Sequence, residues 1–342
     1  MAILSMLVLL GACTPTPSSC DWQSDQLFTK YDFPVGVVAD PGKLQAIPAY
    51  EAIVSSQFNR LTAENIMKPD ALQPAEGVFF FSEADELVAY GERNGQQLHG
   101  HTLLWHKQLP FWMEQFQGTR EEWDAMMKRH IQTIVAHFRG RVTGWDVINE
   151  AFLDDGTLRN NIWQQHIGPS YLEKAFRYAH EADPDAKLFY NDFSLAINPT
   201  KRAAVLQFLK RLVGNGFPVD GIGLQMHIFT RFPENEEISR AINEVWQAGF
   251  EVHLSELDVS MNPLSREMAF APDRELVRQE EKYVYIFNAF GRIPSQFQYG
   301  ITIWGVGDGD SWIRTSFNRQ DYPLLFDDNY QAKPAYCNLI DP

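Results

Sequence analysis

The stretch Trp123–Glu150, WDAMMKRHIQTIVAHFRGRVTGWDVINE, contains the repeating unit from which the fold follows. Its first part has apolar residues at three- and four-residue spacing, which predicts a helix over Trp123–Phe138. After Gly140, a typical residue at a helix C-terminus, Val142–Ile148 is a short apolar run that predicts a buried strand. Two polar residues, Asn149 and Glu150, follow directly. The stretch therefore predicts a helix, a strand, and polar groups where the strand ends.

The same alternation of short apolar runs and amphipathic helical segments continues along the chain. The predicted strands are Gly36–Ala39, Arg60–Ala63, Gln97–Thr102, Val142–Ile148, Lys187–Asn191, Gly221–Gln225, Glu251–Ser255 and Tyr299–Trp304. Further helices are predicted over Tyr171–His180, Lys201–Val213, Ile238–Ala248 and Arg274–Phe290. Since parallel strands need helix-length connections, the pattern predicts an α/β protein, and eight strands can close into a (β/α)8 TIM barrel. An open doubly wound sheet is the alternative, but no G-x-G-x-x-G loop follows the first strand.

Composition is that of a soluble globular chain with one large domain. Of the 342 residues 45% are hydrophobic and 21% are charged, and no low-complexity stretch or linker follows Gln26. We therefore predict a single domain over residues 26–342. The formal net charge of −15, without a basic stripe, excludes nucleic acids and anionic membranes as expected partners. The aromatic content of 13% suits a neutral partner with flat apolar faces, such as a sugar, or a well-filled core.

The N-terminus predicts a targeting segment over residues 1–12. Ala2–Ala12 is apolar but too short to span a bilayer. Leu10-Gly-Ala-Cys13 resembles the lipobox of bacterial lipoproteins, which implies lipidation of Cys13, although no Lys or Arg precedes the apolar run. Residues 13–25, rich in Pro and Ser at their start, would form a tether. We expect an exported bacterial protein, lipid-anchored at the cell envelope or else periplasmic or secreted. A buried N-terminal helix is the alternative.

The other two cysteines, Cys20 and Cys337, lie near the two ends of the predicted domain. Because barrel closure brings the first and last elements together, they could form a disulfide; two free thiols are the alternative. No Cys-x-x-Cys or zinc-ligand spacing occurs, so no metal and no cofactor are expected.

Polar and aromatic residues gather after seven of the predicted strands. They are Glu64, Asn65, Lys68, His101, Trp105, His106, Asn149, Glu150, Asn191, Asp192, Gln225, His227, Glu256, Asp258 and Trp304. A lone Glu after a strand is often only a helix cap, but in a barrel these strand ends share one face, where active sites form. Glu150 and Glu256 end the fourth and seventh strands, roughly opposite each other. Two carboxylates in one pocket suit hydrolysis of a glycosidic bond, which needs an acid and an ionised group.

Short motifs in this set resemble those of glycoside hydrolase family 10. Gly144–Ala151 (GWDVINEA) resembles the acid/base motif of that family, and Leu254–Val259 (LSELDV) resembles its nucleophile motif. Further matches are Thr62–Lys68, Gly100–Pro110, Tyr190–Asp192, Gly223–His227, Trp304–Trp312, Pro323–Asp327 and Lys333–Tyr336. The ordered set covers about Val35 to Tyr336. It implies a single (β/α)8 catalytic domain that acts as a retaining endo-β-1,4-xylanase.

By this resemblance Glu150 is the acid/base and Glu256 the nucleophile. We expect desolvation and the charge of Glu256 to raise the pKa of Glu150, and the two carboxyls to lie about 5–5.5 Å apart. His227 would hydrogen-bond the nucleophile, with Asp258 fixing the His227 tautomer. Asn149 resembles the residue that contacts the 2-hydroxyl of the cleaved sugar.

The resemblance also implies the sugar-binding residues and the partners. The polar set is Glu64, Asn65, Lys68, His101, Gln108 and Gln225, and the apolar walls are Trp105, Trp304 and Trp312. We expect a monomer that binds xylan and xylo-oligosaccharides and contacts membranes only through its lipid anchor. Crowding against the hydroxymethyl group of glucose costs only about 1–3 kcal/mol, which does not exclude weak action on glucans. Many relatives have Asn where this chain has Ser194, which puts one contact in the positive subsites in doubt.

Two other functions compete with this interpretation. A metal-dependent hydrolase could use His101, His106, His227 and His253. Such sites usually begin with H-x-H on the first strand, which is absent, and strict alternation points His253 away from the side of Glu256. A lipoprotein that only binds polysaccharide is disfavoured, because binding alone requires neither carboxylate.

Overall fold

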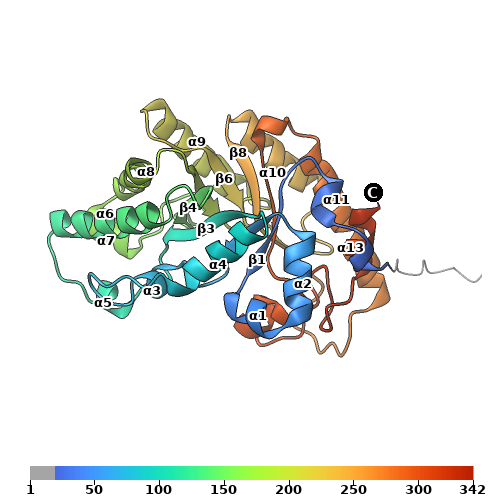
Figure 1. Ribbon diagram of the computed structural model, residues 1–342. Coiled ribbons are helices and arrows are strands. Elements are labelled where there is room, and N and C mark those ends of the chain that lie inside the picture. The colour runs from blue at the N-terminus through green and yellow to red at the C-terminus, as the bar shows by residue number, and fades with distance from the viewer. Residues whose placement is uncertain (1–19, 342) are drawn as a thin grey trace, which may run out of the picture.

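The computed structural model describes residues 20–341, and its centre is a closed barrel of eight parallel strands (Figure 1). The strands are β1 (Val35–Ala39), β2 (Arg60–Ala63), β3 (Gln97–Leu104), β4 (Gly144–Asn149), β5 (Lys187–Asp192), β6 (Gly221–Leu224), β8 (Glu251–Ser260) and β9 (Gln298–Ile303). They pair in chain order, and the β1–β9 and β6–β8 pairings close the circle. The predicted (β/α)8 TIM barrel is therefore confirmed.

One strand was not predicted. β7 (His227–Phe229) pairs only with the far half of β8, with His227 opposite Asp258. β8 is ten residues long, so it extends past the end of β6 and has room for a second partner. Such a strand is invisible in the sequence, because it is three residues long and Met226 before it has a left-handed backbone (φ 57°).

Helices surround the barrel (Figure 1). They are α1 (Pro41–Ala46), α2 (Pro48–Gln57), α3 (Pro69–Leu72), α4 (Ser82–Arg93), α5 (Phe111–Glu114), α6 (Arg120–His137), α7 (Ile162–Ile167), α8 (Tyr171–Ala182), α9 (Pro199–Gly214), α10 (Asn235–Gln247), α11 (Asp273–Gly291), α12 (Trp312–Ser316) and α13 (Pro334–Ile340), with 3-10 turns η1 (Trp22–Ser24), η2 (Leu27–Lys30), η3 (Ser295–Phe297) and η4 (Asp308–Asp310). Predicted helices start up to three residues late where a polar cap precedes the apolar pattern. Thr119 and Glu122 form a capping box before α6, and the Asn198 side chain caps α9.

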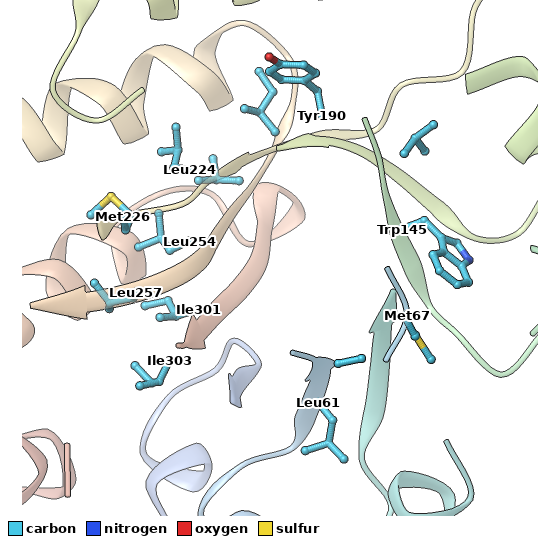
Figure 2. Close-up of a cluster of buried hydrophobic side chains, with 14 of the residues drawn as sticks. Leu61, Met67, Trp145, Tyr190, Leu224, Met226, Leu254, Leu257, Ile301 and Ile303 are labelled. Atoms are coloured by element: carbon cyan, nitrogen blue, oxygen red, sulfur yellow. The ribbon is translucent and has the colours of Figure 1, made fainter. Parts of the chain in front are cut away.

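Apolar side chains fill the space between strands and helices. Figure 2 shows part of this core, with residues from six strands: Leu61, Trp145, Tyr190, Leu224, Leu254, Leu257, Ile301 and Ile303. Each is at most 1% exposed, and burial of one such side chain stabilises the fold by roughly 1.5–3 kcal/mol. The interior of the barrel is different, since polar side chains such as His99, Asp146 and His253 are buried there. This polar interior extends toward the carboxyl ends of the strands, where the functional site lies.

The segment before the barrel corrects one prediction. The targeting segment 1–12, Cys13 and the first part of the tether lie outside the described residues. Residues 20–25, assigned above to the tether, pack on the domain instead. The Trp22 ring lies edge-on to Phe326 (centroids 6.1 Å apart), and buried Gln57 donates to the backbone carbonyls of Trp22 and Asp25 at 3.2 and 3.0 Å. These bonds satisfy backbone groups that a free tether would leave to water.

A disulfide joins Cys20 to Cys337 of α13, with Cα atoms 5.5 Å apart and a sequence separation of 317. It ties the start of the described chain to its end, as the closed barrel allows. Within residues 20–341, no helix has both the length and the apolar character required to cross a membrane.

Candidate active site

A cavity of about 670 Å³ opens at the carboxyl ends of the strands. Every residue predicted as catalytic, supporting or sugar-binding lines it except Asp258, which lies behind His227. The predicted lining residues are Glu64, Asn65, Lys68, His101, Trp105, Gln108, Asn149, Glu150, Gln225, His227, Glu256, Trp304 and Trp312. Barrel closure brings these positions together, although they span 249 positions of sequence from Glu64 to Trp312.

Glu256, on β8, is held by two donors. Asn191 Nδ2 donates to Oε1 at 2.7 Å, and His227 Nε2 lies 3.0 Å from Oε2. Burial by itself would raise the pKa of Glu256. The hydrogen bonds from His227 and Asn191 and the electrostatic interactions with His101 and His227 outweigh it and hold the pKa of Glu256 below its ordinary value. Glu256 is therefore a carboxylate at neutral pH.

His227 stands between two carboxylates because β7 pairs with the end of β8. Its Nδ1 lies 2.8 Å from Asp258 Oδ2, which also accepts a hydrogen bond of 2.9 Å from Trp312 Nε1. Burial opposes the protonated ring, but the charge of Asp258 and the bonds to Asp258 and Glu256 raise the pKa of His227 to about 10. With both ring nitrogens donating, His227 is a cation at neutral pH. This charge keeps Glu256 ionised.

Glu150 has weaker contacts. It follows β4 in a left-handed backbone conformation (φ 59°), and its N–H donates to the Asn191 carbonyl at 2.9 Å. Its carboxyl accepts from Gln225 Nε2 at 3.3 Å and lies 4.0 Å from His106 Nε2. Burial, with the charges of Arg159 and Lys107, lowers the pKa of His106 to about 4, so this ring is neutral at neutral pH. Among residues 20–341, no Lys or Arg forms an ion pair with the Glu150 carboxyl, and the nearby Arg159 donates to the Glu150 backbone carbonyl at 2.9 Å.

Three amide side chains connect the two glutamates. Asn149 Oδ1 lies 3.0 Å from Asn191 Nδ2 and 3.1 Å from Gln225 Nε2. Asn191 is fixed in turn by Ser255, whose hydroxyl donates to Asn191 Oδ1 at 2.6 Å. Asn191 was noted at a strand end but not selected as a site residue. Its position as the last-but-one residue of β5, directly before buried Asp192, is the signal that could have found it.

One end of the cavity is polar. Lys68 Nζ donates to Asn65 Oδ1 at 2.9 Å and lies 5.3 Å from the centre of the Trp105 ring. Burial lowers the pKa of Lys68 and raises that of Glu64, and each charge partly offsets the shift of the other. Such half-buried charges and amides are suited to binding hydroxyl groups.

Seven further residues that line the cavity were not predicted. They are Lys107, Phe193, Ser194, Ile197, Thr315, Ser316 and Phe317. The Phe317 ring is 55% exposed and lies 5.4 Å from the Trp312 ring. Ser194 has a left-handed backbone (φ 63°), a conformation that Asn adopts more easily. These residues lie on loops and short helices beyond the strands, where no periodic pattern identifies them.

The alternative histidine metal site is not assembled. Among residues 20–341, His101, His106, His227 and His253 do not converge at ligand distances. The expectation that His253 points away from the side of Glu256 is wrong, because a register shift between Leu254 and Leu257 breaks the alternation of β8. His253 points into the barrel interior, where its Nε2 lies 2.9 Å from Thr302 Oγ1.

Known proteins share this sequence and architecture. Residues 24–342 match the family described as Glycosyl hydrolase family 10. An endo-1,4-beta-xylanase of Geobacillus stearothermophilus is 39% identical over 326 residues, covering 91% of this chain and 96% of that protein. Xylanase 10B of Thermotoga petrophila, solved in complex with xylobiose, is 37% identical with a TM-score of 0.86 over 92% of this chain and 96% of that one.

A third relative is much longer. Endo-1,4-beta-xylanase A of Thermoanaerobacterium saccharolyticum is 39% identical over 322 residues, which cover 91% of this chain but only 27% of that protein. The chain thus spans about a quarter of the length of this relative. The match of nearly the whole chain, together with the barrel and the two carboxylates at its mouth, establishes that this chain belongs to glycosyl hydrolase family 10.

Proposed function

We propose that the protein is an endo-β-1,4-xylanase that cleaves internal bonds of xylan with retention of anomeric configuration. The observation that carries the proposal is the unequal environment of two carboxyls in one cavity. Glu256 is kept ionised by His227 and Asn191, while within residues 20–341 no Lys or Arg forms an ion pair with the Glu150 carboxyl, since Arg159 donates to the Glu150 backbone carbonyl instead. A retaining glycosidase needs this division between an anionic nucleophile and a proton donor.

In the first step the Glu150 carboxyl donates its proton to the glycosidic oxygen while a Glu256 oxygen attacks the anomeric carbon. The carbon–oxygen bond to the leaving sugar breaks, and a glycosyl ester on Glu256 forms. In the second step the Glu150 carboxylate takes a proton from water, whose oxygen attacks the same carbon and releases Glu256. Two inversions give net retention. Glu150, Glu256 and the attacking water supply the protons and electron pairs of both steps, so no cofactor is required.

The surrounding side chains support recognition of a xylose backbone. Asn149, between the two glutamates, is placed to bind the 2-hydroxyl, a contact that strengthens in the transition state. Trp304 is 7% exposed and its indole lies 5.4 Å from the His101 ring, so the wall beside the reacting sugar is rigid and apolar. Such a wall disfavours the hydroxymethyl group of glucose by about 1–3 kcal/mol. Xylan is therefore preferred, with weak action on glucans.

Product analysis tests this function. The protein should release xylobiose and longer oligosaccharides from unbranched xylan, and very little sugar from cellulose under the same conditions. Proton NMR of the first products should show the β-anomer before mutarotation. In a crystal structure the carboxyls of Glu150 and Glu256 should be about 5–5.5 Å apart. First products in the α-form, or a separation near 8 Å, would instead indicate inversion.

We also propose that a lipid on Cys13 anchors a monomeric enzyme outside the cytoplasm. The support is the Leu10-Gly-Ala-Cys13 sequence after an apolar segment, and a Cys20–Cys337 disulfide, which suits an oxidising compartment. Full-length protein expressed in a bacterial host should fractionate with membranes, whereas the Cys13→Ser variant should not. If both variants stay in the cytosolic fraction with free Cys20 and Cys337 thiols, the segment is not an export signal.

A further inference from the structure

Below the active site, the barrel interior contains a second polar cluster. Its core is His99 of β3, Asp146 of β4 and His253 of β8, each at most 1% exposed. The mechanism proposed above uses none of the three directly. Buried polar groups of this kind need partners, because an unsatisfied polar atom in the interior is costly.

Each residue of the cluster leaves one atom without a hydrogen bond. Within the described chain these atoms are His99 Nε2, Asp146 Oδ1 and His253 Nδ1. The three residues come from different strands, yet their potential ligand atoms all lie within 4.8 Å of one another. His99 Nε2 and Asp146 Oδ1 are 3.2 Å apart without hydrogen-bond geometry. The cluster thus brings together three residues that each have one unsatisfied polar atom.

The other polar atom of each residue is held by its own partner. His99 Nδ1 lies 3.0 Å from the Tyr299 hydroxyl, and His253 Nε2 lies 2.9 Å from Thr302 Oγ1. Asp146 Oδ2 lies 2.9 Å from His101 Nδ1. In metal sites an outer partner of this type orients each ligand and fixes its tautomer. When each imidazole donates to the hydroxyl of its outer partner, the lone pair of its other nitrogen faces the cluster, beside Asp146 Oδ1.

We propose that His99 Nε2, Asp146 Oδ1 and His253 Nδ1 bind one zinc ion in the barrel interior. Two imidazole nitrogens and one carboxylate oxygen form a typical donor set for Zn²⁺, with bonds of about 2.0–2.2 Å and a water as fourth ligand. The separation of 3.2 Å between His99 Nε2 and Asp146 Oδ1 already suits two ligands of a tetrahedral ion. The inference is independent of the xylanase proposal.

One group opposes binding. Arg60 lies over the Tyr299 ring, with its guanidinium carbon 4.0 Å from the ring centre, and donates to the Gln97 side chain at 2.6 Å. Its positive charge weakens the attraction of the cluster for a cation. Because the ligands are at most 1% exposed, zinc must enter during folding or through transient opening of the barrel. A test on folded protein alone would therefore measure access as well as affinity.

Refolding the protein in the presence of zinc separates access to the site from affinity for the ion. Full-length Cys13→Ser protein, which removes the cysteine outside the disulfide, is unfolded in guanidinium with a chelator and without reductant. It is then refolded with two equivalents of Zn²⁺, desalted and analysed by plasma mass spectrometry. We expect about one zinc per chain, because the ligand set provides one site. Less than a tenth of an equivalent in correctly refolded protein overturns the proposal.

Variants assign the site. His99→Phe and His253→Leu should each reduce bound zinc at least tenfold. His130→Leu is the matched control, since His130 is equally buried but both its nitrogens are already bonded, to Gln73 and to the Leu103 carbonyl. It should keep one equivalent. Zinc retained by both cluster variants would place the ion elsewhere and contradict the proposal.

Anomalous diffraction decides the case even if a variant does not fold. Crystals of the refolded wild-type chain should show one peak at the zinc absorption edge between His99, Asp146 and His253. A water molecule at that point, without anomalous signal, would show that the cluster is satisfied by solvent and would refute the zinc site.

Discussion

Glu256 and Glu150 are the same residue type in the same cavity, but their surroundings differ. Glu256 has a hydrogen bond to each oxygen and a protonated imidazole 3.0 Å away. The Glu150 carboxyl accepts a hydrogen bond of 3.3 Å from Gln225 and lies 4.0 Å from a neutral imidazole. The comparison teaches that the chemical role of a carboxyl is determined by neighbours from other strands, not by the strand that bears it.

Removing each carboxyl is the strongest test of this comparison. Glu256→Ala should lower kcat by at least about 10⁴-fold on every substrate, because no glycosyl ester can form. Glu150→Ala should lose about 10²–10⁴-fold on xylan, since general acid catalysis contributes that much, but far less on dinitrophenyl xylobioside. Azide should restore the turnover of Glu150→Ala, because it can attack the glycosyl ester on Glu256 that this variant still forms. Equal losses that azide does not rescue would contradict the assigned roles.

Replacing His227 should weaken the difference between the carboxyls. The pKa of Glu256 lies below its ordinary value partly because His227 is charged, so His227→Asn should raise it. As the pH falls, Glu256 keeps its charge to a lower pH in the wild type than in the variant. The variant should therefore lose activity at a higher pH. We expect kcat/KM to fall about 10–100-fold and the acid limb to move upward, as measured in a pH profile.

His106→Asn is the matched control for that experiment. His106 lies beside Glu150 rather than Glu256, and its pKa of about 4 makes it neutral near neutral pH. Its replacement should leave the acid limb of kcat/KM in place. If both variants shift this limb equally, the effect is not specific to the nucleophile.

Asn191→Ala tests the second donor to Glu256. The change removes the 2.7 Å hydrogen bond that the uncharged Asn191 amide donates to the Glu256 carboxylate, and it leaves the charge of His227 in place. The expected loss in kcat is about tenfold, corresponding to roughly 1.5 kcal/mol for a bond to a charged group. The acid limb should move less than in His227→Asn. A larger shift would mean that the amide, and not the imidazolium, controls the ionisation of Glu256.

Ser194→Asn should have the smallest effect on activity. Ser194 lines the cavity but takes no part in the hydrogen bonds described above for the two carboxyls. Its left-handed backbone suits Asn better than Ser, so the variant should gain about 0.3–0.5 kcal/mol of stability in guanidinium unfolding. The pH profile should be unchanged. A shifted profile would show that the comparison of the two glutamates extends to this loop.

Much of the fold and of the candidate site was predictable, because local sequence patterns indicate the strands and the residues at their ends. The predicted strand Arg60–Ala63 coincides with an observed strand, and the strand-end residues do line one cavity. Errors occurred where a contact distant in sequence decides the structure. β7 exists because β8 is long enough to pair with it, and residues 20–25 are ordered by buried Gln57. His253 was misplaced because a register shift interrupts β8.

By itself, the sequence determined the barrel class, the strand-end carboxylates and the resemblance to family 10, because periodicity and short motifs depend only on neighbouring residues. Only the tertiary structure decided which carboxyl is held ionised, since His227, Asn191 and Glu256 come from β7, β5 and β8 and meet only on closure of the barrel. The same closure brings His99, Asp146 and His253 together. Electrostatic environment depends on distance in space, which no pattern along one chain segment contains.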